Sequence, residues 1–427
     1  VRWAGRTRYG CGISHVLLSV CQAERVRPKL HAAVAVTVGA ILVACSSTSS
    51  TEDTTTSSRP MLVELAPPEQ PERLVSVPET STTSTTTSTT TESPRPDGVA
   101  VLSFTGDTLV HSPLWSAARR HAGGEGFDFG PMFEEVAPII SAADLAVCHL
   151  ETLFAPPGVA YSTMPRYQVP EEVASALVGA GYDRCSTASN HVMDGGTASI
   201  DHTLDVFDEL GLDQHGIART PEEIEPTTFD VNGIVMSHLS YTVHFNGLSL
   251  PADQPWRSAR IDIDRIVEDA KKAREMGAEF VVVSMHWGNE GSNRPNADQK
   301  KWSERLAASE VVDLVIGSHP HLLQSIEKYG DLWVVNSLGN FLSNMPTGER
   351  WAASTQDGAI VEFTVTRIEG GFDVSEPRVH PTWVDRDEGF VIRALGQRRD
   401  SLRGDMAVSW RRTEGVLGDY LVIPGDV

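Results

Sequence analysis

Cysteine is scarce in this sequence, with five residues in 427, and no two of them form a C-x-x-C pair. This scarcity excludes a disulfide-dense scaffold, a zinc knuckle and a dithiol redox motif. Positive charge is also short, because 35 Lys and Arg face 57 Asp and Glu and leave a net charge of −22. An acidic surface without a run of basic residues repels phosphate backbones, so we predict no nucleic-acid partner. The hydrophobic content of 40% is typical of globular proteins and excludes wholesale disorder.

The uncharged run from Ala32 to Ala44 has thirteen residues. It is too short to cross a bilayer, which takes about 20 residues, but it suits the hydrophobic region of a signal peptide. Basic residues at 25–29 precede it, and it ends in L-V-A-C, which resembles a bacterial lipobox with Cys45 as the lipidated residue. We therefore predict a signal peptide with a lipobox over residues 1–45. An ordinary secretory signal cut near Ala44 is the alternative.

Residues 46–98 are predicted to form a disordered Ser/Thr/Pro-rich linker. Thr80–Thr91 is an unbroken run of Ser and Thr, and such a segment buries too little apolar surface to offset its ordering entropy. The predicted protein is therefore extracytoplasmic and tethered to the membrane by lipid, or else secreted. A start at Val26 would give a more usual signal sequence, which makes residues 1–25 a misassigned extension.

From Val99 the pattern becomes that of an α/β domain, predicted to cover residues 99–385. Short apolar runs end in polar clusters and alternate with segments of helical periodicity. The predicted strands are Val99–Thr105, Asp144–Cys148, Tyr182–Thr187, Phe280–Met285, Val312–Ile316 and Trp333–Val335. The predicted helices are Val173–Ala180, Thr197–Leu210, Ile263–Met276 and Asp298–Ala308. Such alternation predicts buried parallel strands whose functional loops gather at their carboxyl ends.

Two later segments, Ala359–Ile368 and Phe372–Val379, are predicted to pair as strands with no helix between them. Residues 386–427 are charged and are predicted to be a peripheral tail. Cys148 and Cys185 each end an apolar run, so buried thiols are expected. A disulfide between them is the alternative, since the predicted compartment is oxidising.

Metal-ligating side chains recur directly after the predicted strands. They are Asp107, His149, Glu151, Asn190, His191, His286, His319 and His321. Imidazole together with carboxylate suits Zn, Mn or Fe, so we predict one or two divalent ions. A carboxylate can bridge two cations, a neutral amide oxygen completes a shell without adding charge, and paired cations lower the pKa of a bound water. The His-Pro-His run places two imidazoles on a loop stiffened by its proline.

The ordered motifs resemble a known family. They are TGD (105–107), HLE (149–151), SNH (189–191), HWG (286–288), GSHPH (317–321) and SLGNF (337–341). This series is similar to the CapA-type bacterial capsule (poly-γ-glutamate) synthesis family of the calcineurin-like metallophosphatase superfamily. The resemblance implies a metallophosphatase-like layered β-sandwich flanked by helices.

The resemblance also implies roles for individual residues. Asp107 and His321 would bind the first metal, with Asp107 binding either that metal alone or both, and Glu151 stands where the wider superfamily has its bridging Asp. The second metal would be held by Asn190, His286 and His319. His191 would be the catalytic acid, acting with Asp107.

The sequence departs from the wider superfamily at two positions. Leu109 replaces a histidine ligand, and His111 is either its substitute or an ordinary surface residue. His149 replaces the more common Asn, and strand alternation puts it on the same side as Glu151. Glu290 and Asn340 are further candidates.

Two functions fit these expectations. The first is an envelope-anchored, divalent-metal-dependent hydrolase with a phosphoesterase-type site, acting in capsule or envelope polymer biosynthesis. The alternative is a non-catalytic accessory protein that binds or guides an anionic envelope polymer. The expected partners are therefore that polymer or a phosphoester, the membrane and the capsule synthesis machinery.

Overall fold

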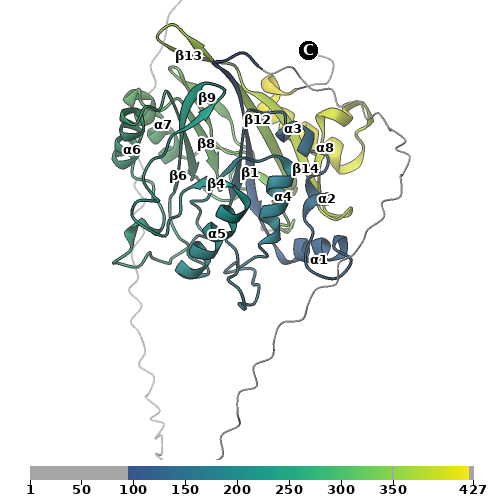
Figure 1. Cartoon of the computed structure of the whole chain (residues 1–427). Helices are drawn as coiled ribbons and strands as arrows, with labels where there is room; N and C mark the ends of the chain where they lie inside the picture. Colours follow the sequence, from purple (N-terminus) through teal and green to yellow (C-terminus); the bar gives the residue numbers. More distant parts are fainter. Residues whose placement is uncertain (1–94, 349–350, 423–427) are drawn as a thin grey trace, which may run out of the picture. The chain divides into compact units, whose positions relative to one another are not determined.

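The computed structural model describes residues 95–348 and 351–422 (Figure 1). The predicted signal peptide, Cys45 and almost all of the predicted linker lie outside these residues. Within them the strands form two sheets of nine and six strands. The first sheet comprises β1 (Val99–Leu109), β2 (Leu145–Leu150), β3 (Arg184–Ser186), β4 (Asp213–His215), β11 (Asn340–Ser343), β12 (Asp357–Ile368), β13 (Gly371–Val374), β14 (Arg378–Asp385) and β15 (Val391–Ala394). The second comprises β5 (Phe229–Val231), β6 (Ile234–Thr242), β7 (Phe280–His286), β8 (Leu314–Ser318), β9 (Ile326–Tyr329) and β10 (Leu332–Val335).

The strand order is β15-β14-β12-β1-β2-β3-β4 in the first sheet, with β11 added to β1 and β13 to β12. In the second it is β5-β6-β7-β8-β10-β9. Strands β1 to β4 run parallel, as do β6, β7, β8 and β10. The carboxyl ends of two parallel sets are therefore available for a site.

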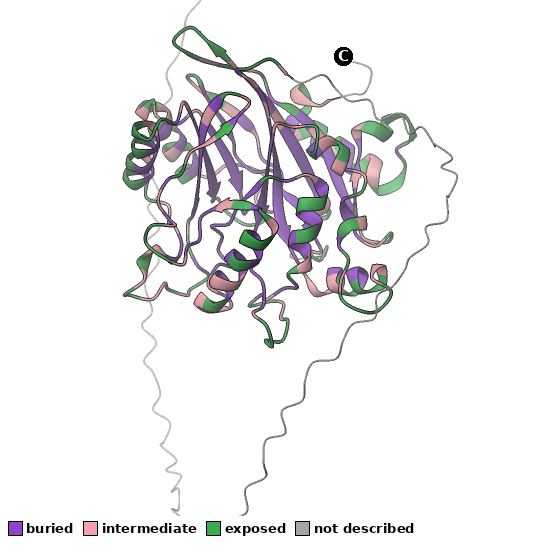
Figure 2. Ribbon diagram, in the orientation of Figure 1, coloured by how far each residue is buried: buried purple, intermediate pink, exposed green. Residues whose placement is uncertain are grey.

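Helices cover the outer faces of both sheets (Figures 1 and 2). The helices are α1 (Ser112–His121), α2 (Gly130–Phe133), α3 (Ala137–Ile140), α4 (Glu172–Ala180), α5 (Gly196–Leu210), α6 (Ile263–Glu275), α7 (Ala297–Ser309) and α8 (Gly404–Leu417). Helices α1–α5 share a core with the outer face of the first sheet, and α6 and α7 share one with the second. The predicted layered α/β fold is confirmed. No helix of the described residues is long and apolar enough to cross a bilayer.

Burial on both faces explains why the strands read as continuous apolar runs. In β2, Leu145 and Val147 face the second sheet, whereas Ala146 and Cys148 face the helices. β7 repeats this alternation: Val282 packs between the sheets and its neighbours pack under α6 and α7. The core between the sheets positions the strand ends that carry the polar clusters.

The predicted pairing of Ala359–Ile368 with Phe372–Val379 is present, but the second segment is divided into two separate strands. β12 pairs antiparallel with both β13 and β14. The predicted second strand breaks at Pro377, which has no backbone N–H to contribute to a ladder.

Cys148 and Cys185 are joined by a disulfide, with their Cα atoms 4.4 Å apart. They face each other directly across the parallel strands β2 and β3. The expectation of free thiols was therefore wrong, because strand register is not visible in the sequence.

Residues 387–422 are part of the fold and not only a peripheral tail. β15 extends the first sheet beside β14, and α8 packs with Trp410 and Leu417 buried. The charges that suggested a tail lie on exposed faces or in ion pairs. One such pair joins Arg412 to Asp357, with a nitrogen–oxygen distance of 2.5 Å.

Arg412→Ala should lower the free energy of unfolding by about 2 kcal/mol, because it leaves the buried Asp357 carboxylate without its cation. Burial already raises the pKa of Asp357, and Arg412 opposes that rise. The loss should therefore shrink as the pH is lowered and Asp357 takes up a proton. Urea unfolding at several pH values measures both effects. Arg411→Ala, on the exposed face of the same helix, is the control, and equal losses in the two variants would contradict the assignment.

Candidate metal centre

The carboxyl ends of strands from both sheets meet at one place. Asp107 lies near the end of β1, and His149 lies in β2 with Glu151 directly after it. His286 ends β7, and the His-Pro-His turn follows β8. Asn190 joins the group through its Oδ1 atom, 3.0 Å from His286 Nε2. The structure thus brings all six predicted metal-binding residues together.

Asp107 is the acid shared within this group. It forms one cluster of ligand atoms with His149 and His286, and a second with Glu151 and His321. Each cluster's atoms lie within 4.8 Å of one another. This geometry gives Asp107 the bridging place between the two clusters, although the resemblance pointed to Glu151 for that place. A third cluster of His319, His321 and Glu290 adjoins them.

Glu151 carries the unsatisfied charge of the site. It is fully buried, and neither carboxylate oxygen has a hydrogen-bond partner among the described residues. His321 Nε2 lies 3.8 Å from Glu151 Oε1, and His191 Nε2 lies 4.0 Å from it. Burial raises the pKa of Glu151 well above its ordinary value, and Asp107 adds to the rise while His321 opposes it. Because a buried carboxylate without partners is costly, this donor set fits a divalent cation.

Asn340 orients His321. Its Oδ1 atom lies 3.0 Å from His321 Nδ1, and its amide nitrogen donates to the Thr355 carbonyl at 2.9 Å. The Nδ1 atom also lies 3.1 Å from Asp107 Oδ2, so Nδ1 carries the proton and Nε2 faces Glu151. Burial alone would lower the pKa of His321, but Glu151 and Asp107 raise it to about 10.

The other imidazoles of the centre are held neutral, which is the form that binds metals. Burial lowers the pKa of His149 and His286, and it lowers that of His319 to about 3. His149 is fixed by Ser186 Oγ, 2.8 Å from its Nδ1 atom, and its Nε2 atom lies 2.9 Å from His286 Nδ1.

The His-Pro-His turn has a strained backbone. His319 and His321 have φ values of 95° and 59°, in the left-handed region that non-glycine residues rarely adopt. Asp107 helps to hold this shape, since its Oδ1 atom accepts the His319 amide at 3.2 Å. Strain of this kind persists where surrounding contacts enforce it, and it is common at functional sites.

His191 lies beside the carboxylates and is oriented by Asp194. Their Nδ1 and Oδ2 atoms are 2.6 Å apart, and the Tyr167 amide donates to the same oxygen at 2.7 Å. No role for Asp194 was predicted from the sequence. Its spacing of three residues from His191 was the available signal. His191 Nε2 is left facing Glu151 and the amide of Asn246.

The remaining candidates lie around the centre. The Nδ1 atom of His111 lies 3.0 Å from the Leu109 carbonyl oxygen and 3.3 Å from the Asn344 amide nitrogen, and the ring is outside the three ligand clusters. Burial lowers the pKa of His111 to about 4. Leu109 is a wall of the adjoining pocket. The structure therefore has no histidine at the position for which the resemblance implies a metal ligand.

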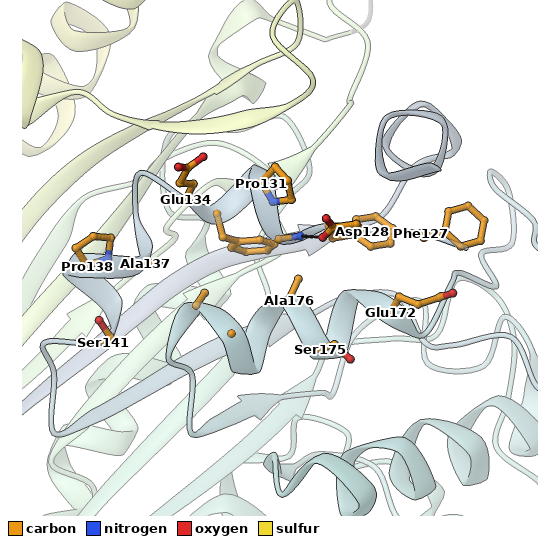
Figure 3. A pocket seen from close by; sticks show the side chains of 15 residues that line it. Phe127, Asp128, Pro131, Glu134, Ala137, Pro138, Ser141, Glu172, Ser175 and Ala176 are labelled. Carbon is orange, nitrogen blue, oxygen red and sulfur yellow. Dashed lines mark hydrogen bonds between the residues drawn. The ribbon is translucent and has the colours of Figure 1, made fainter. Parts of the chain in front are cut away.

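The volume of a pocket does not identify the metal centre in this structure. A pocket of about 820 Å³ lies between α2, α3 and α4 (Figure 3). Its walls include Phe127, Pro131 and Pro138, and none of the site histidines or acids lines it. A smaller pocket, of about 520 Å³, opens onto His191 and His321.

Two solved structures are similar to this chain at a low level. One is a calcineurin-like phosphoesterase YfkN from Bacillus subtilis, with 10% identity, a TM-score of 0.40, and coverage of 75% of this chain and 98% of that chain. The other is the NAD nucleotidase of Haemophilus influenzae, with 12% identity, a TM-score of 0.39, and coverage of 76% and 64%. Similarity at this level carries no argument about the chemistry of this chain.

Sequence relatives are more informative. A capsule biosynthesis protein CapA from Bacillus anthracis is 28% identical over 197 residues, which cover 45% of this chain and 46% of that protein. The PGA biosynthesis protein CapA of Bacillus subtilis (strain 168) is 27% identical over 341 residues, covering 75% of this chain and 82% of that protein. The family model "Bacterial capsule synthesis protein PGA_cap" matches residues 101–345, more than half of the chain and nearly the whole stretch that carries the ligand clusters. The chain therefore belongs to the PGA_cap family of bacterial capsule synthesis proteins.

Proposed function

We propose that this protein is a divalent-metal-dependent hydrolase with a phosphoesterase-type site. The observation that carries the proposal is the buried, unpartnered carboxylate of Glu151, set beside Asp107 in a ring of imidazoles. The residues that would hold one or two ions are Asp107, His149, Glu151, Asn190, His286, His319 and His321. Bound cations would polarise a phosphoryl oxygen and lower the pKa of a coordinated water.

The chain's own residues supply the proton transfer. His191 would donate a proton from Nε2 to the leaving oxygen, because that atom faces the carboxylate pair. Asp194 holds the opposite ring nitrogen and stabilises the charged imidazole before the transfer. Tyr167 contacts the same ring at 4.7 Å between ring centres and limits its rotation. Asn340 keeps His321 in the orientation that presents Nε2 to the site.

We further propose that the protein acts outside the cytoplasm, anchored through lipid on Cys45, in capsule or cell-envelope polymer biosynthesis. The lipobox-like sequence supports the anchor, and membership in a capsule synthesis family supports the process. Secretion without an anchor is the alternative. The capsule synthesis machinery is the proposed partner.

A second function is an accessory protein that binds an anionic polymer without turnover. Leu109 favours it, since the superfamily's usual histidine ligand is replaced by a residue that cannot bind metal. The matched relatives are also named for biosynthesis and not for hydrolysis. In this case the cations would bridge protein and polymer carboxylates.

The variant His191→Gln separates the two functions. If the protein is a hydrolase, the metal-loaded variant should bind its ions as the parent does and lose about a hundredfold in kcat on a phosphate monoester. Metal content by elemental analysis and release of inorganic phosphate measure the two quantities.

His202→Gln is the matched control. His202 lies on α5, pairs with Glu171 at the start of α4, and belongs to none of the ligand clusters. It should leave both quantities unchanged. Wild-type protein that binds metal but releases no phosphate from a panel of monoesters would defeat the hydrolase and favour the accessory role.

A further inference from the structure

The pocket beside the centre has walls of an unusual mixed character. It measures about 520 Å³ and reaches His191 and His321 at its inner end. Its apolar lining includes Leu109, Met164, Tyr167, Met345 and Trp351. Neutral hydrogen-bonding groups stand between these residues, and they are Ser112, Thr163, Asn344 and Thr347.

Two aromatic side chains connect this pocket to the reacting groups. The ring of Tyr167 stands edge-on to His191, with centres 4.7 Å apart. The ring of Trp351 stands edge-on to His321, with centres 6.2 Å apart. A group held against either ring is therefore next to the proton donor or to a metal-binding imidazole. Both side chains are largely buried, with 2% of Tyr167 and 8% of Trp351 exposed, so protein contacts fix their orientation and only a small part of each faces the pocket.

The described lining of the pocket carries little charge. Among the described residues that line it, Glu290 is the only acid, and there is no Lys or Arg. Arg386 influences His111 electrostatically, but its guanidinium donates to the Met345 carbonyl and is not part of the lining. A chain with one carboxylate per unit would place charges beside Glu290 and against apolar walls without compensation.

We propose that this pocket binds an uncharged sugar ring, so that the substrate is a sugar phosphate monoester. The inference rests on the proposed hydrolase and names its leaving group. Flat aromatic surfaces take the apolar face of a sugar, and neutral hydroxyl and amide groups take its hydroxyls. A water oxygen bonds to phosphorus, the bond from phosphorus to the sugar oxygen breaks, and His191 protonates that oxygen. One proton of the water stays on the phosphate, and the other leaves to solvent, from which His191 is reprotonated. The products are the free sugar and inorganic phosphate.

The test compares glucose 1-phosphate with glycerol 3-phosphate, which carries the same phosphate group without a ring. Metal-loaded wild-type protein should prefer glucose 1-phosphate by about tenfold in kcat/KM. Trp351→Ala should bring that ratio near one, mainly through KM, and Trp351→Tyr should restore most of it. Trp256→Ala, at a separate pocket beside the short 3₁₀ helix η1 (Pro255–Arg257), should keep the wild-type ratio.

Binding measurements keep the inference testable if no ester is hydrolysed. Calorimetric titration of metal-loaded His191→Gln protein should give tighter binding of glucose 1-phosphate than of glycerol 3-phosphate or inorganic phosphate. The same preference, together with no hydrolysis of either ester by the metal-loaded wild-type protein, would defeat the hydrolase and retain the sugar pocket. Equal binding of the two esters, or tighter binding of a γ-glutamate oligomer, would overturn the sugar pocket whatever the activity. If Trp351→Ala fails to fold, the wild-type preferences and Trp351→Tyr still decide the question.

Discussion

Glu151→Gln should lower the affinity for divalent cations by about a thousandfold, equivalent to about 4 kcal/mol. The wild-type carboxylate is fully buried, and neither of its oxygens has a hydrogen-bond partner among the described residues. A cation is therefore the partner that its charge requires, and the neutral amide cannot supply the same attraction. Calorimetric titration with Mn²⁺ or Zn²⁺ measures the change.

In the metal-free protein, the same substitution should not lower the free energy of unfolding. It replaces a buried carboxyl group that has no hydrogen-bond partner among the described residues, so stability should stay equal or increase. Glu362→Gln is the control, because Glu362 is similarly sheltered but has a partner in His380, 2.8 Å away. That variant should keep its metal affinity. A large stability loss in metal-free Glu151→Gln would contradict the description of Glu151 as unpartnered.

The pH dependence of the metal-free protein follows from the same groups. The pKa of Glu151 is raised on folding, so the stability it contributes is complete below its unfolded value of about 4.3 and is lost as the pH rises through the raised value. The pKa of His321 is raised to about 10, so its contribution is complete below about 6.5 and is lost as the pH rises through 10. Metal-free protein should therefore lose stability between about pH 6.5 and 10. Metal binding should release protons and strengthen over the same range, and Glu151→Gln should reduce that release.

Gly106→Ala should destabilise the protein by about 3 kcal/mol or more. A Cβ atom at this position would lie 2.0 Å from the Gly339 carbonyl oxygen and 2.8 Å from that of Leu338. Both obstacles are backbone atoms, so no side chain can move aside. The close approach lets the Asp107 amide donate to the Gly339 carbonyl at 2.9 Å, where β1 meets β11.

Thermal and urea unfolding of metal-free protein test this prediction without involving the site's ligands. Gly415→Ala is the matched control, since Gly415 is exposed within α8 and nothing lies within 4 Å of an added Cβ. It should stabilise the protein by about 0.5–1 kcal/mol, because glycine is a poor helix former. Similar effects from the two substitutions would show that β1 and β11 do not approach as closely as described. Any separation of these strands should also displace Asp107 and weaken metal binding.

Much of the site could be predicted because its signals are local. Parallel strands buried on both faces appear as apolar runs, and the polar residue that follows each run lies at a carboxyl end. This reasoning found Asp107, Glu151, Asn190 and the His-Pro-His turn. It also predicted helices α4 to α7, since amphipathic periodicity needs only neighbouring residues, but it missed α1, α2, α3 and α8.

Other features depend on contacts between distant segments. The order of ligands along the chain left open whether Asp107 serves one metal or both, and it did not indicate that Asn340 orients His321. The packing of α8 was hidden because its charged residues suggested a tail, while its attachment depends on Trp410 and the Arg412 ion pair.

The sequence by itself determined which chemistry is available: imidazoles and carboxylates at strand ends, and an α/β framework to carry them. Only the tertiary structure decided how those groups are shared, which histidines stay neutral, and which walls surround the pocket. The physical reason is that periodicity and motifs are properties of adjacent residues. Burial, pKa and ligand sharing are set by strand register and by the close approach of two sheets, to which residues more than two hundred positions apart contribute, as Asp107 and the His319 amide do.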